Sequence, residues 1–217
     1  MDDTPRTPDD ALALVLAGNR RFCDDCPTAY AQDLDLLHAL TAERQAPIVA
    51  VLACADSRVP VGMIFDQSIG RLFVARVAGY SATTEVIASL EYSVAMLGVK
   101  AIIVMGHTNC GAILAAIRNE PVPGQISALF AAILPAIHLA EDAGEDEDAV
   151  TRRHVQNQVD VLTRSSTVIA HAVGDGTLKV VPALYDVATG EVALLDMPAT
   201  QRARAADATG SRPRAGR

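Results

Sequence analysis

Two cysteines and one histidine fall in two short polar segments whose residue types could bind a metal ion. The first segment is Cys54-Ala55-Asp56-Ser57-Arg58, and the second is His107-Thr108-Asn109-Cys110. A set of two thiolates and one imidazole suits zinc, and catalytic zinc sites take three protein ligands and keep a fourth position for water or substrate. The alternative is that both cysteines are ordinary small buried residues. Three candidate ligands beside an Asp and an Arg on one loop point to an enzyme.

Asp56 and Arg58 are two residues apart, a spacing at which they can form a charge-assisted and bidentate ion pair. An arginine in this position would keep the carboxylate ionised and aimed. The carboxylate could then accept a hydrogen bond from a water molecule on the zinc and fix its orientation, or it could bind zinc itself and close the site. A third possibility is that the ion pair only braces the loop.

Both polar segments follow apolar runs that predict buried strands. Residues 48–53 and 101–106 are continuous apolar runs, as is typical of parallel strands covered on both faces. Ligands of open parallel sheets bind beyond the carboxyl ends of the strands. Because Cys54 and His107 end two such strands, we expect them to converge. Cys110 falls at the expected start of a helix, where the dipole and free amides would favour its thiolate.

The remaining pattern predicts an α/β fold with a mostly parallel open sheet of about five strands, flanked by helices, with an antiparallel C-terminal edge strand. A first amphipathic helix, capped by Asp9 or Asp10, should run toward Phe22. Further expected elements are a helix at 34–42, a strand at 72–77, a helix at 83–97, helices to about residue 170, and strands at 178–181 and 191–195. We predict a single domain over residues 1–198 and a basic, disordered tail over 199–217.

The composition narrows the class of protein. Half of the 217 residues are hydrophobic, and the formal net charge of −8 argues against a nucleic-acid partner. No apolar run is long enough for a membrane span, and the amino terminus does not resemble a secretory signal. Thiolate ligands need reduced cysteines, so we expect a cytoplasmic protein. The histidines outside the second segment lie on predicted helices without partners, and we expect structural or exposed roles for them: His38, His138, His154 and His171.

These segments resemble the β-class carbonic anhydrases. The resemblance is carried by Cys54 to Pro60 (CADSRVP) and His107 to Ala112 (HTNCGA). It extends to other segments along roughly residues 10 to 197, namely Gln45-Ala46-Pro47, Leu72-Phe73-Val74, Ser89-Leu90-Glu91-Tyr92 and Tyr185-Asp186 with Thr189-Gly190. Together the two paired segments are highly specific to that family.

The resemblance implies a zinc lyase that reversibly hydrates carbon dioxide to bicarbonate and a proton. One zinc ion per chain would be bound by Cys54, His107 and Cys110, and Asp56 and Arg58 would form the catalytic dyad. The zinc would lower the pKa of its water to about 7. Two other hypotheses remain beside this one. The first is a hydrolase of carbon disulfide or carbonyl sulfide on the same scaffold, and the second is a non-catalytic zinc protein that acts in assembly.

The resemblance also implies a substrate pocket. Gln45 would donate a hydrogen bond to carbon dioxide or bicarbonate, and Phe73 and Tyr92 would line an apolar pocket, partly across the interface of a homodimer or higher even oligomer. Gln45 fits plant-like and cyanobacterium-like members, whose zinc keeps its water; in another branch the Asp binds zinc reversibly. Two residues depart from the family pattern. Tyr80 stands where Asn is common, and Pro182 stands where Gly is common, which a strand tolerates only at an edge or a bulge.

Overall fold

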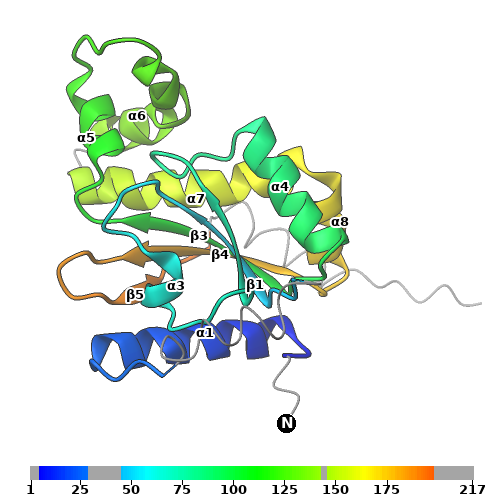
Figure 1. The fold of residues 1–217 in the computed structure, drawn as a ribbon. Coiled ribbons are helices and arrows are strands. Elements are labelled where there is room, and N and C mark those ends of the chain that lie inside the picture. Colours follow the sequence, from blue (N-terminus) through cyan, green and yellow to red (C-terminus); the bar gives the residue numbers. More distant parts are fainter. Residues whose placement is uncertain (1–4, 29–44, 143–145, 198–217) are drawn as a thin grey trace, which may run out of the picture.

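Five strands form one sheet through the middle of the chain, in the order β2-β1-β3-β4-β5 (Figure 1). The computed structural model describes residues 5–28, 45–142 and 146–197. The strands are β1 (Val49–Ala53), β2 (Leu72–Arg76), β3 (Ala101–His107), β4 (Lys179–Tyr185) and β5 (Val192–Leu194). The first four are parallel, and β5 pairs antiparallel with β4. The predicted fold class is confirmed, including the antiparallel C-terminal edge.

Helices cover both faces of the sheet (Figure 1). The described helices are α1 (Pro8–Cys23), α3 (Val61–Ile64), α4 (Thr84–Ala95), α5 (Gly111–Arg118), the 3-10 helix η2 (Ile126–Ala132), α6 (Leu134–Asp142), α7 (Glu147–Ser165) and α8 (Thr167–Gly174). Successive strand residues point to opposite faces. Leu52 and Ile102 therefore pack into the core under α4, α7 and α8, whereas Val51 and Ile103 pack into the core under α1 and α3.

The position of β1 and β3 in the middle of the sheet explains their apolar sequences. Every residue of β1 and β3 is buried, because helices cover them above and below and strands flank them on both sides. This double burial is the physical reason for their continuous apolar runs. Since Ala53 pairs with Met105, Cys54 follows β1 at the level of Gly106, and His107 ends β3 one residue further along, so both reach the carboxyl edge of the sheet.

The first helix begins earlier than predicted. Its N-cap is Thr7, whose hydroxyl oxygen accepts a hydrogen bond from the Asp10 amide at 3.1 Å, while the Asp10 carboxylate accepts one from the Thr7 amide at 3.2 Å. This is a capping box with proline in the first helical turn. The predicted caps, Asp9 and Asp10, were therefore wrong by two or three residues.

Some sequence predictions fall on residues that the structure does not describe. The helix expected at 34–42 and the basic tail at 199–217 lie outside the described residues, so the domain limits of 1–198 and 199–217 stay predictions. Among the residues that are described, no helix is long and apolar enough to cross a membrane.

Pro182 lies within β4 at a point where the missing amide costs little. Its carbonyl accepts a hydrogen bond from the Leu195 amide at 2.9 Å, so its ring nitrogen faces the same side, away from β3. The ladder with β5 pairs only residues 183–185 of β4. Pro182 therefore lies just outside that ladder, where no strand needs its amide and proline is tolerated.

Candidate metal centre

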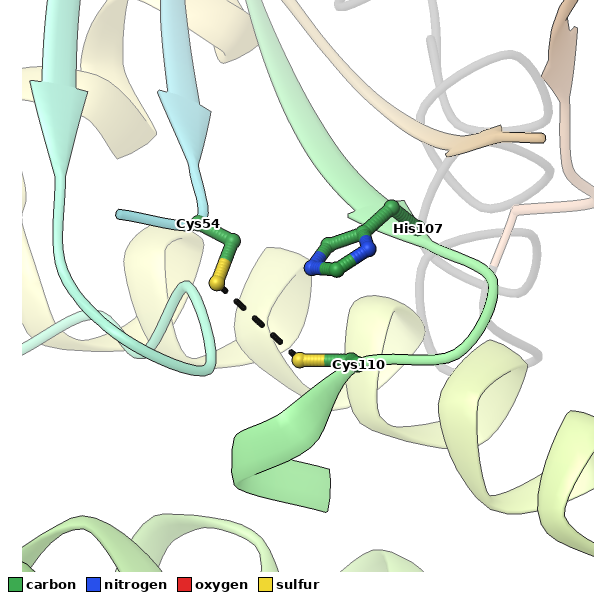
Figure 2. A group of neighbouring side chains, drawn as sticks. All are labelled: Cys54, His107 and Cys110. Carbon is green, nitrogen blue, oxygen red and sulfur yellow. Dashed lines mark hydrogen bonds between the residues drawn. The ribbon is translucent and has the colours of Figure 1, made fainter. Parts of the chain in front are cut away.

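Cys54, His107 and Cys110 converge at the carboxyl edge of the sheet (Figure 2). One ligand atom from each side chain lies within 4.8 Å of the other two, and the Sγ atoms of the two cysteines are 4.0 Å apart. Two sulfurs bound to one zinc at tetrahedral angles, with bonds of about 2.3 Å, would be about 3.8 Å apart. The spacing of the three side chains therefore fits a zinc ion.

The strand ends and one tight loop place these three side chains. Cys54 follows β1 directly, His107 is the last residue of β3, and Cys110 is the N-cap of α5. Asn109 has a positive φ of 54°, which turns the chain back toward the sheet between His107 and Cys110. The hairpin after β4 holds this loop, because Thr108 donates its amide to the Tyr185 carbonyl and accepts a hydrogen bond from the Val187 amide.

The imidazole of His107 offers one nitrogen to a ligand. Its Nδ1 lies 3.0 Å from the Thr108 carbonyl oxygen, and since a carbonyl only accepts, Nδ1 carries the proton. The remaining nitrogen, Nε2, is buried and has no hydrogen-bond partner among the described residues. A buried acceptor without a partner is costly unless something else binds it, and here it faces two thiols. This donor set fits a metal ion.

The two thiols differ in their readiness to ionise. The hydrogen bond from Cys110 lowers the pKa of the Cys54 thiol, and donors around Cys54 that include the Gly79 amide act in the same direction. The same hydrogen bond with Cys54, followed by burial, raises the pKa of the Cys110 thiol. The first thiolate therefore forms easily and the second is opposed by its negative neighbour. A divalent cation between the sulfurs would remove that opposition.

Asp56 and Arg58 form the predicted bidentate pair at the rim of this cluster. Oδ1 of Asp56 accepts hydrogen bonds from the backbone amide (2.8 Å) and Nε (3.0 Å) of Arg58, and Oδ2 accepts one from Nη2 at 2.8 Å. These hydrogen bonds hold the pKa of Asp56 well below its usual range. Oδ2 is also 3.9 Å from Nε2 of His107, so the carboxylate stands beside the ligand cluster.

Arg76 and Gly79 support the same loop, although no pattern in the sequence predicted a role for either of them. Arg76 ends β2 and donates to the carbonyl of Cys54 at 2.8 Å and to the carbonyl of Asp56 at 2.6 Å. Gly79 donates its amide to Sγ of Cys54 at 3.4 Å. The position of Arg76 at the carboxyl end of a strand next to β1 was the available signal, but it requires the strand order.

The predicted substrate residues do not join this cluster within one chain. Gln45 is exposed and precedes β1, whereas Cys54 follows it, so the two lie at opposite ends of that strand. Phe73 pairs with Ala50, four residues before Cys54, which is about 13 Å along the strand. The ring of Phe73 packs instead against Tyr92, with ring centroids 6.4 Å apart. The roles of Gln45, Phe73 and Tyr92 stay predictions.

Tyr80, the departure from the family pattern, is fully buried behind the cluster. Its backbone has a positive φ of 43°, and its ring packs against the ring of His154 with centroids 5.0 Å apart. Burial raises the pKa of its hydroxyl well above the usual value. The hydroxyl has no hydrogen-bond partner among the described residues. Tyr80 therefore fills space between β3 and α7 and makes no polar contact there.

Comparison with known proteins gives one consistent family. The sequence model described as carbonic anhydrase matches residues 49–192. The carbonic anhydrase 2 of Mycobacterium tuberculosis is 35% identical over 184 residues, which cover 82% of this chain and 88% of that protein. A carbonic anhydrase of Mycolicibacterium smegmatis is 36% identical over 182 residues, with the same two coverages.

Solved structures agree with the sequence comparison. A β-carbonic anhydrase of Aspergillus fumigatus superposes with a TM-score of 0.70 at 28% identity, covering 92% of this chain and 97% of that one. The Coccomyxa β-carbonic anhydrase, solved in complex with acetazolamide, gives 0.66 at 26% identity and covers 90% and 97%. Fold and site thus define an α/β enzyme with a Cys2His cluster at the carboxyl edge of its sheet. The chain belongs to the β-class carbonic anhydrases.

Proposed function

We propose that Cys54, His107 and Cys110 bind one zinc ion per chain and that this ion serves the reversible hydration of carbon dioxide, the reaction of the family. The observation that carries the proposal is the convergence of three buried ligand atoms beside an ion-paired carboxylate. One of the three is an imidazole nitrogen that has no hydrogen-bond partner in the part of the chain that the structure describes. When bound, zinc lowers the pKa of a coordinated water to about 7, so that a nucleophile exists at neutral pH.

The chain's own residues orient the reaction. Arg58 holds Asp56 ionised through three hydrogen bonds, and it donates a further one to the Asn109 carbonyl at 3.0 Å, which ties the two polar segments together. Asp56 then accepts a hydrogen bond from the attacking water and directs its lone pair at the carbon of carbon dioxide. The water oxygen forms a bond to the carbon, and the water loses a proton to buffer, which leaves bicarbonate.

We further propose that Asp56 orients water and does not bind the metal. Both of its oxygens already accept hydrogen bonds from Arg58, and to become a ligand the carboxylate would have to give up part of that geometry. The site then keeps an open position. A non-catalytic zinc site would have no use for this pair, which speaks against the assembly hypothesis.

Substitution of Asp56 by alanine tests the proposal. We expect Asp56→Ala to retain zinc in a one-to-one ratio and to lose about 100-fold in kcat/KM, because the attacking water is no longer oriented. Metal analysis and stopped-flow hydration on the same sample measure both quantities. The matched control is Asp9→Ala on α1, which removes a carboxylate from an exposed ion pair with Lys179 of β4 and should change neither quantity.

The same assay across pH separates the open site from the closed one. Activity at neutral pH agrees with Asp56 held by Arg58, whereas activity confined to alkaline pH would place Asp56 on the metal. Parent protein without bound zinc would overturn the metal proposal. Full activity of Asp56→Ala would overturn the orienting role while leaving the metal site in place.

We also propose that a second copy of the chain completes the substrate pocket. Phe73 and Tyr92 lie away from their own cluster, and Tyr92 is 47% exposed on α4, where a partner can reach it. Gln45, exposed before β1, would supply an amide hydrogen bond to the substrate oxygens. The β-carbonic anhydrases of Sordaria macrospora, which share the fold, are described as tetrameric. Reduced thiolate ligands favour the cytoplasm as the compartment, which cell fractionation would check.

A further inference from the structure

His154, which the sequence analysis expected to have no partner, is buried in α7 against the loop behind the metal centre. Its Nε2 lies 2.9 Å from the carbonyl oxygen of Gly79. A carbonyl oxygen can only accept, so Nε2 carries the proton and donates it. Burial lowers the pKa of His154 to about 4, and the backbone of Gly79 and of Ala132 opposes this only in part. The imidazole is therefore neutral, with one donor and one acceptor.

Gln158, one helical turn further along α7, fixes the same assignment from the other side. Its Oε1 accepts a hydrogen bond from the Ala82 amide at 2.8 Å, which leaves its Nε2 to face His154. That nitrogen is 3.5 Å from Nδ1 of His154, a long contact in which the amide donates and the unprotonated imidazole nitrogen accepts. Two side chains at i and i+4 on α7 thus hold the loop at Gly79 and at Ala82.

The segment between these two anchor points is a tight turn. The Tyr80 amide donates to the Val77 carbonyl at 2.9 Å, and Gly79 and Tyr80 have successive positive φ values of 75° and 43°. Such a conformation is costly for a tyrosine and persists only when its surroundings impose it. Here the ring of His154, against which Tyr80 packs, holds the turn together with two hydrogen bonds to the Gly79 carbonyl, one from His154 and one from the Ser81 hydroxyl at 3.3 Å.

This turn delivers a hydrogen bond to a candidate ligand. The Gly79 amide, which points to Sγ of Cys54 at 3.4 Å, belongs to the peptide unit next to the one that carries the Gly79 carbonyl. A displacement of the Gly79 backbone that released its carbonyl from His154 would also move its amide relative to the sulfur. An amide that donates to a thiolate stabilises its charge and orients its lone pairs.

We propose that His154 is a positioning residue of the metal centre, which acts through Gly79 to aim an amide at the thiolate of Cys54. Gln158 supports it by keeping the imidazole in the tautomer that donates from Nε2. The inference rests on the proposed function, because it assigns Cys54 to the metal. Its effect is on the ligand sulfur, and no contact between His154 and the substrate is involved.

The test compares variants of the full-length protein by zinc affinity, measured by competition with a chelator, and by the absorption of the cobalt(II)-substituted protein. His154→Phe keeps a ring against Tyr80 but removes the donor, and we expect about tenfold weaker zinc binding, as for other outer residues of metal sites. Loss of the amide contact makes the sulfur more electron-rich, so the thiolate-to-cobalt absorption band should move to longer wavelength.

Two further variants separate positioning from general stability. Leu162→Ala creates a cavity at a fully buried position on the same helix and should lower stability without changing zinc affinity or the absorption band. His154→Gln places an amide nitrogen near the position of Nε2 and should restore most of the affinity and the parent band. The inference is wrong if His154→Phe behaves like Leu162→Ala, or if His154→Gln behaves like His154→Phe.

If His154→Phe folds poorly, Gln158→Leu tests the inference instead, because it frees the imidazole to change its tautomer. Zinc affinity and absorption band unchanged in Gln158→Leu would then overturn the inference. Measurements on the parent protein and on Cys54→Ala distinguish failure of the proposed zinc site from failure of the proposed role of His154. A parent that binds no zinc, or a Cys54→Ala variant that binds it as well as the parent, contradicts the metal site itself rather than the role of His154.

Discussion

Tyr80, which stands where the family commonly has Asn, buries a hydroxyl whose effect on stability can be measured. Because this hydroxyl has no partner among the described residues, its desolvation is not compensated. We expect Tyr80→Phe to leave the free energy of unfolding unchanged or to raise it by about 1 kcal/mol. Urea denaturation would measure the difference. The ring, which packs on His154, is retained in this variant, so the turn at Gly79 should keep its conformation.

Ser93→Ala is the matched control for that prediction. The hydroxyl of Ser93 is equally buried but donates to the Leu90 carbonyl at 2.7 Å, so its removal should cost about 1 kcal/mol. A loss of 1 kcal/mol or more in Tyr80→Phe would contradict the prediction and would indicate a buried water bound to the tyrosine. The comparison thus distinguishes the Tyr80 hydroxyl, which only fills space, from the Ser93 hydroxyl, which donates a hydrogen bond.

At the scale of the elements, the close approach of β3 and α7 depends on Gly106. A Cβ atom at this position would lie 2.5 Å from Cγ2 of Val155 and 3.1 Å from the ring of Tyr80. Valine is stiff and cannot turn away, so the helix would have to move. We expect Gly106→Ala to lower the free energy of unfolding by about 1 to 3 kcal/mol, measured by thermal or urea denaturation.

Gly111, at the start of α5, offers the control for Gly106. A Cβ atom there would meet nothing within 4 Å, and its φ is not positive. Gly111→Ala should therefore be neutral or stabilise the protein by up to about 1 kcal/mol through the higher helix propensity of alanine. Equal stability of the Gly106→Ala and Gly111→Ala variants would show that β3 and α7 are not closely packed.

The elements also show how far sequence reasoning reaches. Buried parallel strands are predictable because double burial demands apolar residues throughout, and this located Cys54 and His107 at strand ends. The capping box of Thr7 could have been predicted from its Thr-Pro-Asp-Asp sequence, but Asp9 and Asp10 are also common N-cap residues and were chosen instead. The contacts of Arg76 and His154 could not be predicted from the sequence. Arg76 contacts Cys54, 22 residues away, through the order of the strands, and His154 contacts the turn at Gly79, 75 residues away.

At the scale of the whole molecule, exposed apolar side chains lie on or next to the edge strand β2 and the helix α4 beside it. Ile69, Val74, Tyr92 and Met96 are between 39% and 70% exposed, and α4 packs directly against β2. Among the described residues β2 pairs on one side only, and such an edge with apolar neighbours is a surface that a partner would cover. It also carries the Phe73 and Tyr92 pair, so the proposed second copy would place these rings near the partner's metal centre.

A charge on this surface should break the assembly and with it the activity. We expect Val74→Glu to shift the particle toward the monomer mass of 22.8 kDa in sedimentation and to lower kcat/KM at least tenfold, because each pocket loses the rings of the other chain. Leu139→Glu places the same charge on an exposed leucine of α6 and should change neither quantity. A Val74→Glu monomer with full activity would refute the shared pocket, and a Val74→Glu protein that keeps the parent's oligomeric mass would refute this interface. Since dissociation is governed by mass action, the lost activity should return in part as the protein concentration is raised.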